Sequence, residues 1–281
     1  MRSSAPWIPS SPSSSEIMPD QFCIVTPSFN QAPYLEATMQ SVLSQNMPGL
    51  QYIVLDGGST DGSADIIRRY GDRLAYWESA PDKGQSDAIH RGFQRGKGNI
   101  LGWLNSDDTL EPGALERVAR VFAENPDVMF VYGDYYVLYP DGSKVLKPKV
   151  SFDFNIALYA YLMIPQPSAF WRREAYEEIG GLNLDLHYAM DWDLFLRIGQ
   201  RHPQKFVHIR EPLSTFRVHP ESKSVSKRTA FSKEIRFVQG QFMNDPRWRR
   251  KIKEKLYLLK IEWMYLTERG TLILKKDKSK A

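Results

Sequence analysis

The chain has 281 residues with a net charge of +4, and 42% of its residues are hydrophobic and 25% charged, an ordinary globular composition. No stretch approaches the roughly 18 apolar residues of a membrane-spanning helix, the N-terminus lacks the apolar segment of a signal peptide, and the single cysteine, Cys23, excludes an intrachain disulfide. The protein is therefore expected in the cytoplasm, with peripheral contact to the inner face of the cell membrane left open.

Residues 1–19 contain seven Ser and four Pro and almost no apolar periodicity. Because such a segment cannot bury enough surface to offset its ordering entropy, it is expected to be a disordered leader.

From residue 21 onward, short apolar runs alternate with amphipathic segments. This pattern predicts helices over 34–43, 64–70 and 86–94, a helix opened by Pro112, and strands over 22–26, 52–55, 74–77, 100–104 and 128–132. The alternation predicts βαβ units and a mainly parallel sheet flanked by helices. In such a sheet, ligands bind beyond the carboxyl ends of the strands. Four polar clusters follow these strands and are expected to converge on one sheet edge, at 28–31, 56–61, 82–87 and 105–108.

Beyond Asp134, strand-like and helix-like patterns alternate less regularly. The turn at 140–142 predicts a hairpin between 135–138 and 144–147, and the pattern further predicts a strand at 168–171 and helices at 192–198 and from about 228 onward. The last helix contains an apolar seam formed by Ile252, Leu256, Leu259, Trp263 and Leu266. Three interpretations stay open for this seam: packing on the body, pairing with a second copy as a homodimer, or contact with a membrane interface.

The basic residues are concentrated at the C-terminus. Residues 247–281 contain twelve Lys or Arg and four Asp or Glu, so the tail has a surplus of eight positive charges and the remainder a deficit of four. A basic tail can bind anionic lipid or nucleic acid, and a solvated basic helix face is the alternative. Because the aromatic residues of this tail fit an amphipathic helix, no nucleic acid partner is expected.

The strongest chemical signature is Asn105-Ser106-Asp107-Asp108 after a predicted strand. Adjacent carboxylates repel one another, so a bound cation would explain the pair, and oxygen ligands suit Mg²⁺ or Mn²⁺. The alternative is a turn in which one aspartate caps the following helix.

The other polar clusters also allow two interpretations each. Asp56 could accept hydrogen bonds from a base or ribose, while its loop could equally be a tight turn with a helix cap. Phe29 could stack on a nucleobase or cap the core, and Lys83 could bind a phosphate or remain in solvent. Asp191, at the start of a predicted helix, could act as a general base or cap that helix.

Taken together and in order, these segments resemble the family-two inverting glycosyltransferases with the GT-A fold, and among them the bacterial branch that builds O-antigen and exopolysaccharide. The resemblance covers about 22–219, with matching runs at 25–30, 56–62, 81–88, 105–108, 166–168 and 191–197. It implies a GT-A (Rossmann-like) domain over 20–225, followed by a basic amphipathic helical extension over 226–281.

The resemblance also implies roles for single residues. Asp191 is the catalytic base, Asp108 coordinates Mn²⁺ or Mg²⁺, and His219 approaches the metal or diphosphate unless it is structural. Nucleotide binding is assigned to Thr26, Pro27, Phe29, Asn30, Asp56, Ser59, Lys83, Asp87 and Asp107. Contacts to the donor or acceptor sugar are assigned to Trp103, Asn105, Gln166 and Trp192. The chain departs from the family pattern at Gly57 and Met190, where Asp and Glu are frequent.

The implied function is inverting transfer of a sugar from a nucleotide-diphosphate donor, a UDP-sugar, to a hydroxyl of a glycan or lipid-linked acceptor in cell-surface polysaccharide biosynthesis. Two alternatives remain. A nucleotidyltransferase would be expected to have a Gly-rich, basic phosphate loop after the first strand, and residues 26–31 contain neither Gly nor Lys. A sugar-nucleotide or glycan-binding protein without turnover would not need both Asp108 and Asp191.

Overall fold

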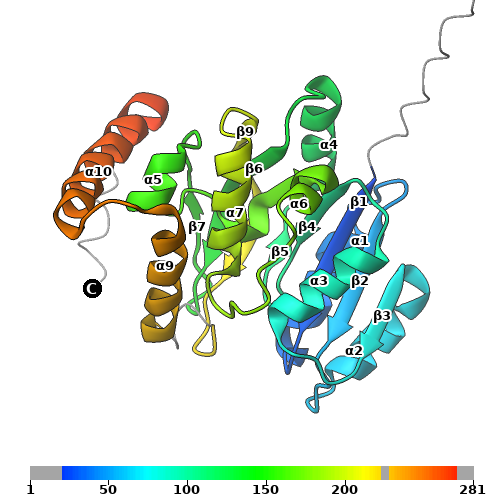
Figure 1. Ribbon diagram of the computed structural model, residues 1–281. Helices are drawn as coiled ribbons and strands as arrows, with labels where there is room; N and C mark the ends of the chain where they lie inside the picture. Colours follow the sequence, from blue (N-terminus) through cyan, green and yellow to red (C-terminus); the bar gives the residue numbers. More distant parts are fainter. Residues whose placement is uncertain (1–20, 223–227, 271–281) are drawn as a thin grey trace, which may run out of the picture.

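The computed structural model describes residues 21–222 and 228–270. The leader predicted for 1–19 lies outside the described residues. The strands form one sheet in the order β3-β2-β1-β4-β8-β6-β9-β5, and β7 pairs with β6 (Figure 1). Their bounds are β1 Phe22–Ser28, β2 Gln51–Asp56, β3 Tyr76–Ser79, β4 Ile100–Trp103, β5 Thr109–Leu110, β6 Phe130–Leu138, β7 Lys144–Lys147, β8 Ala169–Arg172 and β9 Phe206–Arg217.

The first four strands in this order are parallel, as the βαβ pattern predicts. The other half is mixed, because β8 runs antiparallel to both β4 and β6 while β6 and β9 are parallel. Helices cover the sheet: α1 Ala32–Leu43, α2 Ser63–Arg69, α3 Gln85–Arg95, α4 Ala114–Glu124, α5 Phe154–Tyr159, α6 Arg173–Glu178, α7 Met190–Arg201, α9 Arg228–Phe242 and α10 Arg247–Arg269.

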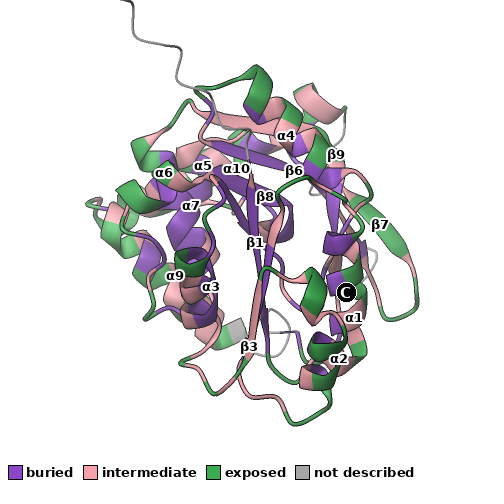
Figure 2. Ribbon diagram, turned by 90° about the vertical axis from the view of Figure 1, so that its right-hand side faces the viewer, coloured by how far each residue is buried: buried purple, intermediate pink, exposed green. Residues whose placement is uncertain are grey.

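The central strands are buried on both faces, and alternate side chains enter two different cores. In β1, Cys23 and Val25 pack with α3 and α7, whereas Phe22 and Ile24 pack with α1 and α4. Figure 2 shows these strands as buried and the outer helix surfaces as exposed. This two-sided burial explains why the sequence of the strand is a continuous apolar run. The parallel pairing places the carboxyl ends of β1, β2 and β4 at one edge of the sheet.

The C-terminal helices pack against the body through one face only. Val238 of α9 joins the main core, and Ile261, Met264 and Tyr265 of α10 pack with Ile156 of α5. The predicted apolar seam of α10 is a different face: its side chains are exposed, with Leu259 68% and Trp263 62% accessible. The seam therefore does not pack on the body of this chain. Among the described residues, no helix combines the length and hydropathy needed to cross a bilayer.

Candidate active site

A cavity of about 790 Å³ lies at the edge of the sheet where the predicted polar clusters meet. Its volume is within the range of small-molecule sites. Seven of the site residues expected from the sequence line it: Pro27, Phe29, Trp103, Asn105, Asp107, Gln166 and Asp191. Gly57, Asp82 and Gln85, which belong to the polar clusters expected at this edge, line it as well. The sequence assigned no role to several other lining residues, among them Tyr135, Lys149, Tyr161, Tyr188, Phe216 and Glu221.

One end of the cavity is a flat slot beside Phe29, whose side chain is 60% exposed. Gly57 forms the floor of the slot, because a Cβ there would lie 3.2 Å from Asp82 and 3.3 Å from Phe29. An aromatic ring with one free face and a carboxylate beside it suits a planar nucleobase. The glycine that departs from the family pattern therefore provides the space that an aspartate would fill.

Asp56 does not line this slot, contrary to the expectation that it binds the base. Its side chain is buried and accepts hydrogen bonds from the Ser59 N–H at 2.9 Å, the Ser59 hydroxyl at 2.5 Å and the Ser79 hydroxyl at 2.7 Å. These bonds hold the loop after β2 closed, so Asp56 and Ser59 shape the slot from behind.

Other residues expected at the nucleotide also lie outside the cavity lining. The hydroxyl of buried Thr26 bonds to Tyr52 at 2.9 Å, and Asn30 accepts a hydrogen bond from the Thr60 N–H at 3.0 Å. Lys83 is exposed, and Asp87 lies 3.7 Å from Arg91 on the same helix. None of these side chains belongs to the cavity wall.

The two adjacent aspartates are placed differently, because only the carboxylate of Asp107 reaches the cavity. Asp107 lines the cavity, and its Oδ2 lies 3.0 Å from Nε2 of His219. Asp108 is fully buried and accepts the Arg217 backbone N–H at 3.0 Å. Burial, followed by the charge of Asp107, raises the pKa of Asp108 well above its usual range. The expectation that Asp108 is the metal ligand therefore needs correction, since Asp107 has the accessible carboxylate.

His219 does not line the cavity itself but stands behind Asp107, with its ring 4.6 Å from that of Tyr34. Its Nδ1 is buried and has no hydrogen-bond partner among the described residues. A neutral imidazole that donates from Nε2 to Asp107 leaves Nδ1 as an unsatisfied acceptor. The His219 ring is therefore placed to orient the Asp107 carboxylate. No group of three or more candidate metal ligands is found within 21–222 and 228–270.

The middle of the cavity is held by an amide network. Gln166 donates to the Trp103 carbonyl at 2.8 Å, and Asn105 donates to Gln166 at 3.2 Å and accepts from Gln85 at 2.7 Å. The fourth expected sugar contact, Trp192, is absent from the lining. Its indole N–H donates to the Ala157 carbonyl at 2.9 Å inside the core, because it occupies the inward face of α7.

Asp191 lies in the first turn of α7 and faces the cavity. Its Oδ1 accepts the Trp192 N–H at 2.8 Å, which fixes the carboxylate. Burial raises the pKa of Asp191 to about 6, with a smaller contribution from the charge of Glu234. A carboxylate with this pKa is a stronger base than an exposed aspartate and is still ionised at neutral pH.

Glu234 of α9 holds the loop that leads into α7. Its carboxylate accepts backbone N–H bonds from His187 at 3.0 Å, Tyr188 at 2.7 Å and Ala189 at 2.9 Å. N–H groups at a helix start lack partners within the helix, and a negative charge there is favourable. A residue of the C-terminal region thus positions the turn that contains Asp191.

We expect Glu234→Gln to lower kcat about tenfold or more, because misplacement of a catalytic group by a fraction of an ångström is costly. Removal of the Glu234 charge should also lower the pKa of Asp191, so the acidic limb of the pH–rate profile should move to lower pH. Steady-state kinetics over pH 4–9 would measure both, with exposed Glu254→Gln as the control. A lower rate with an unmoved profile would mean that the electrostatic part of this account is wrong.

Comparison with known proteins decides the family. A model described as Glycosyl transferase family 2 matches residues 23–180, more than half of the chain. The chain belongs to glycosyl transferase family 2. The match covers the slot, the aspartate pair and Gln166, and it ends before Asp191.

Individual relatives support the same assignment. The chain is 27% identical over 223 residues to the hyaluronan synthase of Pasteurella multocida, covering 79% of this chain but only 23% of the synthase, about a quarter of its length. It is 32% identical over 181 residues to a PGL/p-HBAD biosynthesis glycosyltransferase of Mycobacterium bovis, covering 63% of this chain and 68% of the relative.

Solved structures confirm the expected GT-A fold of this family member. The structure of S. aureus TarS in complex with UDP has a TM-score of 0.62 and 14% identity, covering 88% of this chain and 73% of that one. The mannosyltransferase PcManGT from Pyrobaculum calidifontis in complex with GDP-Man and Mn²⁺ has a TM-score of 0.59 and 17% identity, covering 93% and 80%.

Proposed function

We propose that this chain transfers a sugar from a nucleotide-diphosphate donor to an acceptor hydroxyl, with inversion at the anomeric carbon. One observation supports this above the rest: the Phe29 slot and the carboxylates of Asp107 and Asp191 border one cavity, and His219 stands behind Asp107. A donor with its base in the slot and its diphosphate near Asp107 would present its sugar toward Asp191.

In this proposal, Phe29 stacks on the base and Asp82 accepts a hydrogen bond from the base edge. Because uracil has one N–H on its pairing edge, a carboxylate at this position suits a uridine nucleotide, and UDP-sugars are the proposed donors. The solved structures with this fold include complexes with UDP, with UDP-GlcNAc and with GDP-Man and Mn²⁺.

Asp107 offers the accessible carboxylate for a divalent cation, Mn²⁺ or Mg²⁺, because these ions prefer oxygen ligands, and His219 would hold that carboxylate in place through Nε2. When bound, such an ion neutralises charge on the departing diphosphate. The ring of His219 packs against Tyr34. The groups proposed to meet the diphosphate thus lie in the segments that follow β4 and β9.

Asp191 takes the proton of the acceptor hydroxyl as that oxygen forms a bond to the anomeric carbon. The bond to the diphosphate breaks on the opposite face, and the electron pair leaves with the nucleoside diphosphate. One protein carboxylate is sufficient because a diphosphate is a good leaving group, whereas a glycosidase needs a second carboxyl to protonate its leaving oxygen. The acceptor in this proposal is a glycan or a lipid-linked sugar of a cell-surface polysaccharide, such as O-antigen or exopolysaccharide.

The experiment is UDP release from a panel of UDP-sugars by the full chain, with Mn²⁺ and with EDTA, and mass spectrometry of added acceptors. Metal-dependent release with a product of inverted configuration is the expected result. Donor binding without any release would instead identify a nucleotide-sugar-binding protein. Pyrophosphate formation from UTP and a sugar phosphate would identify a nucleotidyltransferase.

A lipid-linked acceptor would lie at a membrane surface, and we propose that the exposed face of α10 binds this surface. We name this face the α10 ridge: Trp248, Ile252, Leu256, Leu259, Trp263 and Leu266. Each of these side chains is at least 49% exposed, and together they form a contiguous apolar stripe at helical spacing. Exposed Arg249, Lys251 and Lys255 flank it. Tryptophan and leucine beside cations suit the headgroup region of an anionic lipid surface, where the acceptor would be found.

Leu259→Glu together with Trp263→Glu should weaken binding to vesicles of phosphatidylglycerol and phosphatidylethanolamine more than tenfold, because each buried side chain is worth roughly 1.5–3 kcal/mol. Cosedimentation would measure the loss. Leu184→Glu is the matched control, since Leu184 is 43% exposed and lies far from α10 in the sequence. If the wild type is a dimer that the ridge variant converts to a monomer without any vesicle binding, the ridge is a homodimer interface.

A further inference from the structure

The wall of the cavity away from the Phe29 slot contains a buried lysine. Lys149 follows β7, is 4% exposed, and lines the cavity beside Tyr135 of β6 and Tyr161. In the sheet, four strand steps separate β2 behind the slot from β6, which is roughly 19 Å along the sheet. Lys149 therefore faces the region beyond the donor rather than the nucleobase.

The charge of Lys149 is not neutralised by the protein. Its Nζ donates to the Tyr161 hydroxyl at 2.7 Å and lies 5.2 Å and 4.7 Å from the ring centres of Tyr135 and Tyr161. Among the described residues no carboxylate forms an ion pair with it, and it is the only cation in the described cavity lining. A buried ammonium without a countercharge is costly, and two tyrosines offset only part of that cost.

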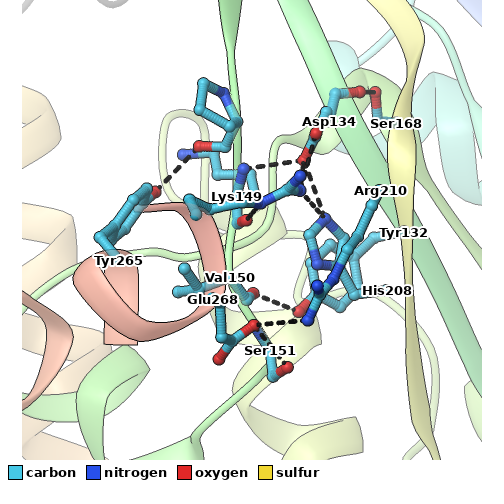
Figure 3. Close-up of polar contacts among 12 residues, drawn as sticks. Tyr132, Asp134, Lys149, Val150, Ser151, Ser168, His208, Arg210, Tyr265 and Glu268 are labelled. Carbon is cyan, nitrogen blue, oxygen red and sulfur yellow. Dashed lines mark hydrogen bonds and ion pairs between the residues drawn. The ribbon is translucent and has the colours of Figure 1, made fainter. Parts of the chain in front are cut away.

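Hydrogen bonds hold the main chain at Lys149 in place (Figure 3). The Lys149 N–H donates to Asp134 Oδ1 at 2.8 Å, and its carbonyl accepts from Arg269 Nε at 2.7 Å. The Asp134 carboxylate is itself occupied by Arg269, at 2.7 Å from both oxygens, and by His208 at 2.9 Å. Asp134 thus holds the backbone of Lys149 and leaves its ammonium free to meet a ligand.

We propose that Lys149, Tyr135 and Tyr161 form an acceptor subsite that recognises an anionic group, a carboxylate or a phosphate, on the sugar next to the reacting hydroxyl. That the ligand is the acceptor rests on the proposed function. That the ligand is an anion rests on the contacts of Lys149 described above. The sugar ring lies against the tyrosine faces, and the anion pairs with Nζ. Because the other charged side chains of the described lining, Asp82, Asp107, Asp191 and Glu221, are all acidic, an anion has only this position to pair with in the described lining.

The test compares ligand binding by the full chain, with and without UDP, by calorimetry. The probes are methyl glucuronide, glucose 1-phosphate and the neutral methyl glucoside, so that the two anionic arms distinguish a carboxylate from a phosphate. The wild type should bind one anionic probe at least about tenfold more tightly than the neutral one, in line with a charge-assisted hydrogen bond. Lys149→Met should abolish that preference, Lys149→Arg should retain much of it, and all forms should bind UDP equally.

Lys147→Met is the matched control, because Lys147 lies two residues away and does not line the cavity. Equal affinity of the wild type for charged and neutral probes would overturn the proposal, and so would an unchanged preference in Lys149→Met. A loss of UDP affinity in Lys149→Met would assign the lysine to the donor diphosphate instead. These readouts do not depend on turnover, so a failure of UDP-sugar cleavage would count against the proposed function alone.

Discussion

Asp191→Asn should lower kcat/KM for sugar transfer by about 10²–10⁴-fold, the usual contribution of a general base. The amide preserves the shape of the side chain and its hydrogen bond from the Trp192 N–H but cannot accept the acceptor proton. UDP affinity should be unchanged, because Asp191 lies beyond the diphosphate end of the cavity. The measurement is UDP release with a saturating acceptor, paired with UDP binding by calorimetry.

The pH dependence of the wild type follows from the same group. Burial raises the pKa of Asp191 to about 6, and only the ionised carboxylate accepts a proton. Activity should therefore be low below about pH 5, rise through pH 6 and level off above about pH 7. Asp191→Asn should show residual activity without this acidic limb.

Asp185→Asn provides a matched control, because Asp185 is an exposed aspartate in the loop before α7 that does not line the cavity. It should leave both the rate and the profile unchanged. If Asp191→Asn retained wild-type turnover, the assignment of the base would be wrong, and Glu221 would be the next carboxylate of the cavity to test.

Arg269→Met should destabilise the protein by about 3–5 kcal/mol, because it leaves the charge of Asp134 buried with less compensation. Asp134 is 1% exposed, and Arg269 Nη2 lies 2.7 Å from each of its oxygens. The other contacts to this carboxylate come from His208 and the Lys149 N–H. Urea unfolding followed by tryptophan fluorescence would measure the change.

Two comparisons make this prediction specific. Arg210→Met removes an arginine that is 57% exposed and lies 3.5 Å from Glu268, so it should cost less than about 1 kcal/mol. Asp134→Asn combined with Arg269→Met should recover part of the loss, because the uncompensated charge is then absent. If Arg269→Met alone were as stable as the wild type, the Arg269–Asp134 ion pair would not be what holds α10 on the body.

Local sequence patterns predicted part of the secondary structure and missed the rest. Most strands and helices over 22–132 follow from apolar periodicity, which is local, but the two-residue strand β5 is too short to show a period. The placement of polar loops at the carboxyl ends follows from parallel pairing. Strand β9 was missed because Pro212 interrupts its apolar pattern. In the structure, Pro212 pairs with Asp134 of β6, where the register between the two strands is irregular. Helices α5 and α6 were also missed, because six residues are too few to show a helical period.

Within the site, the sequence by itself determined that Phe29 and Asp107 would meet at one sheet edge, since each follows a strand whose carboxyl end is fixed by parallel pairing, whereas Asp191 was assigned to the site only through the family resemblance. Only the tertiary structure decided which of two adjacent aspartates faces that cavity and that Trp192 belongs to the core, because neighbouring residues in one loop or helix point in different directions and periodicity does not fix which. It also brought Lys149 and Glu234 to the site. Both arrive through packing between segments distant in the chain, and no local pattern records such contacts.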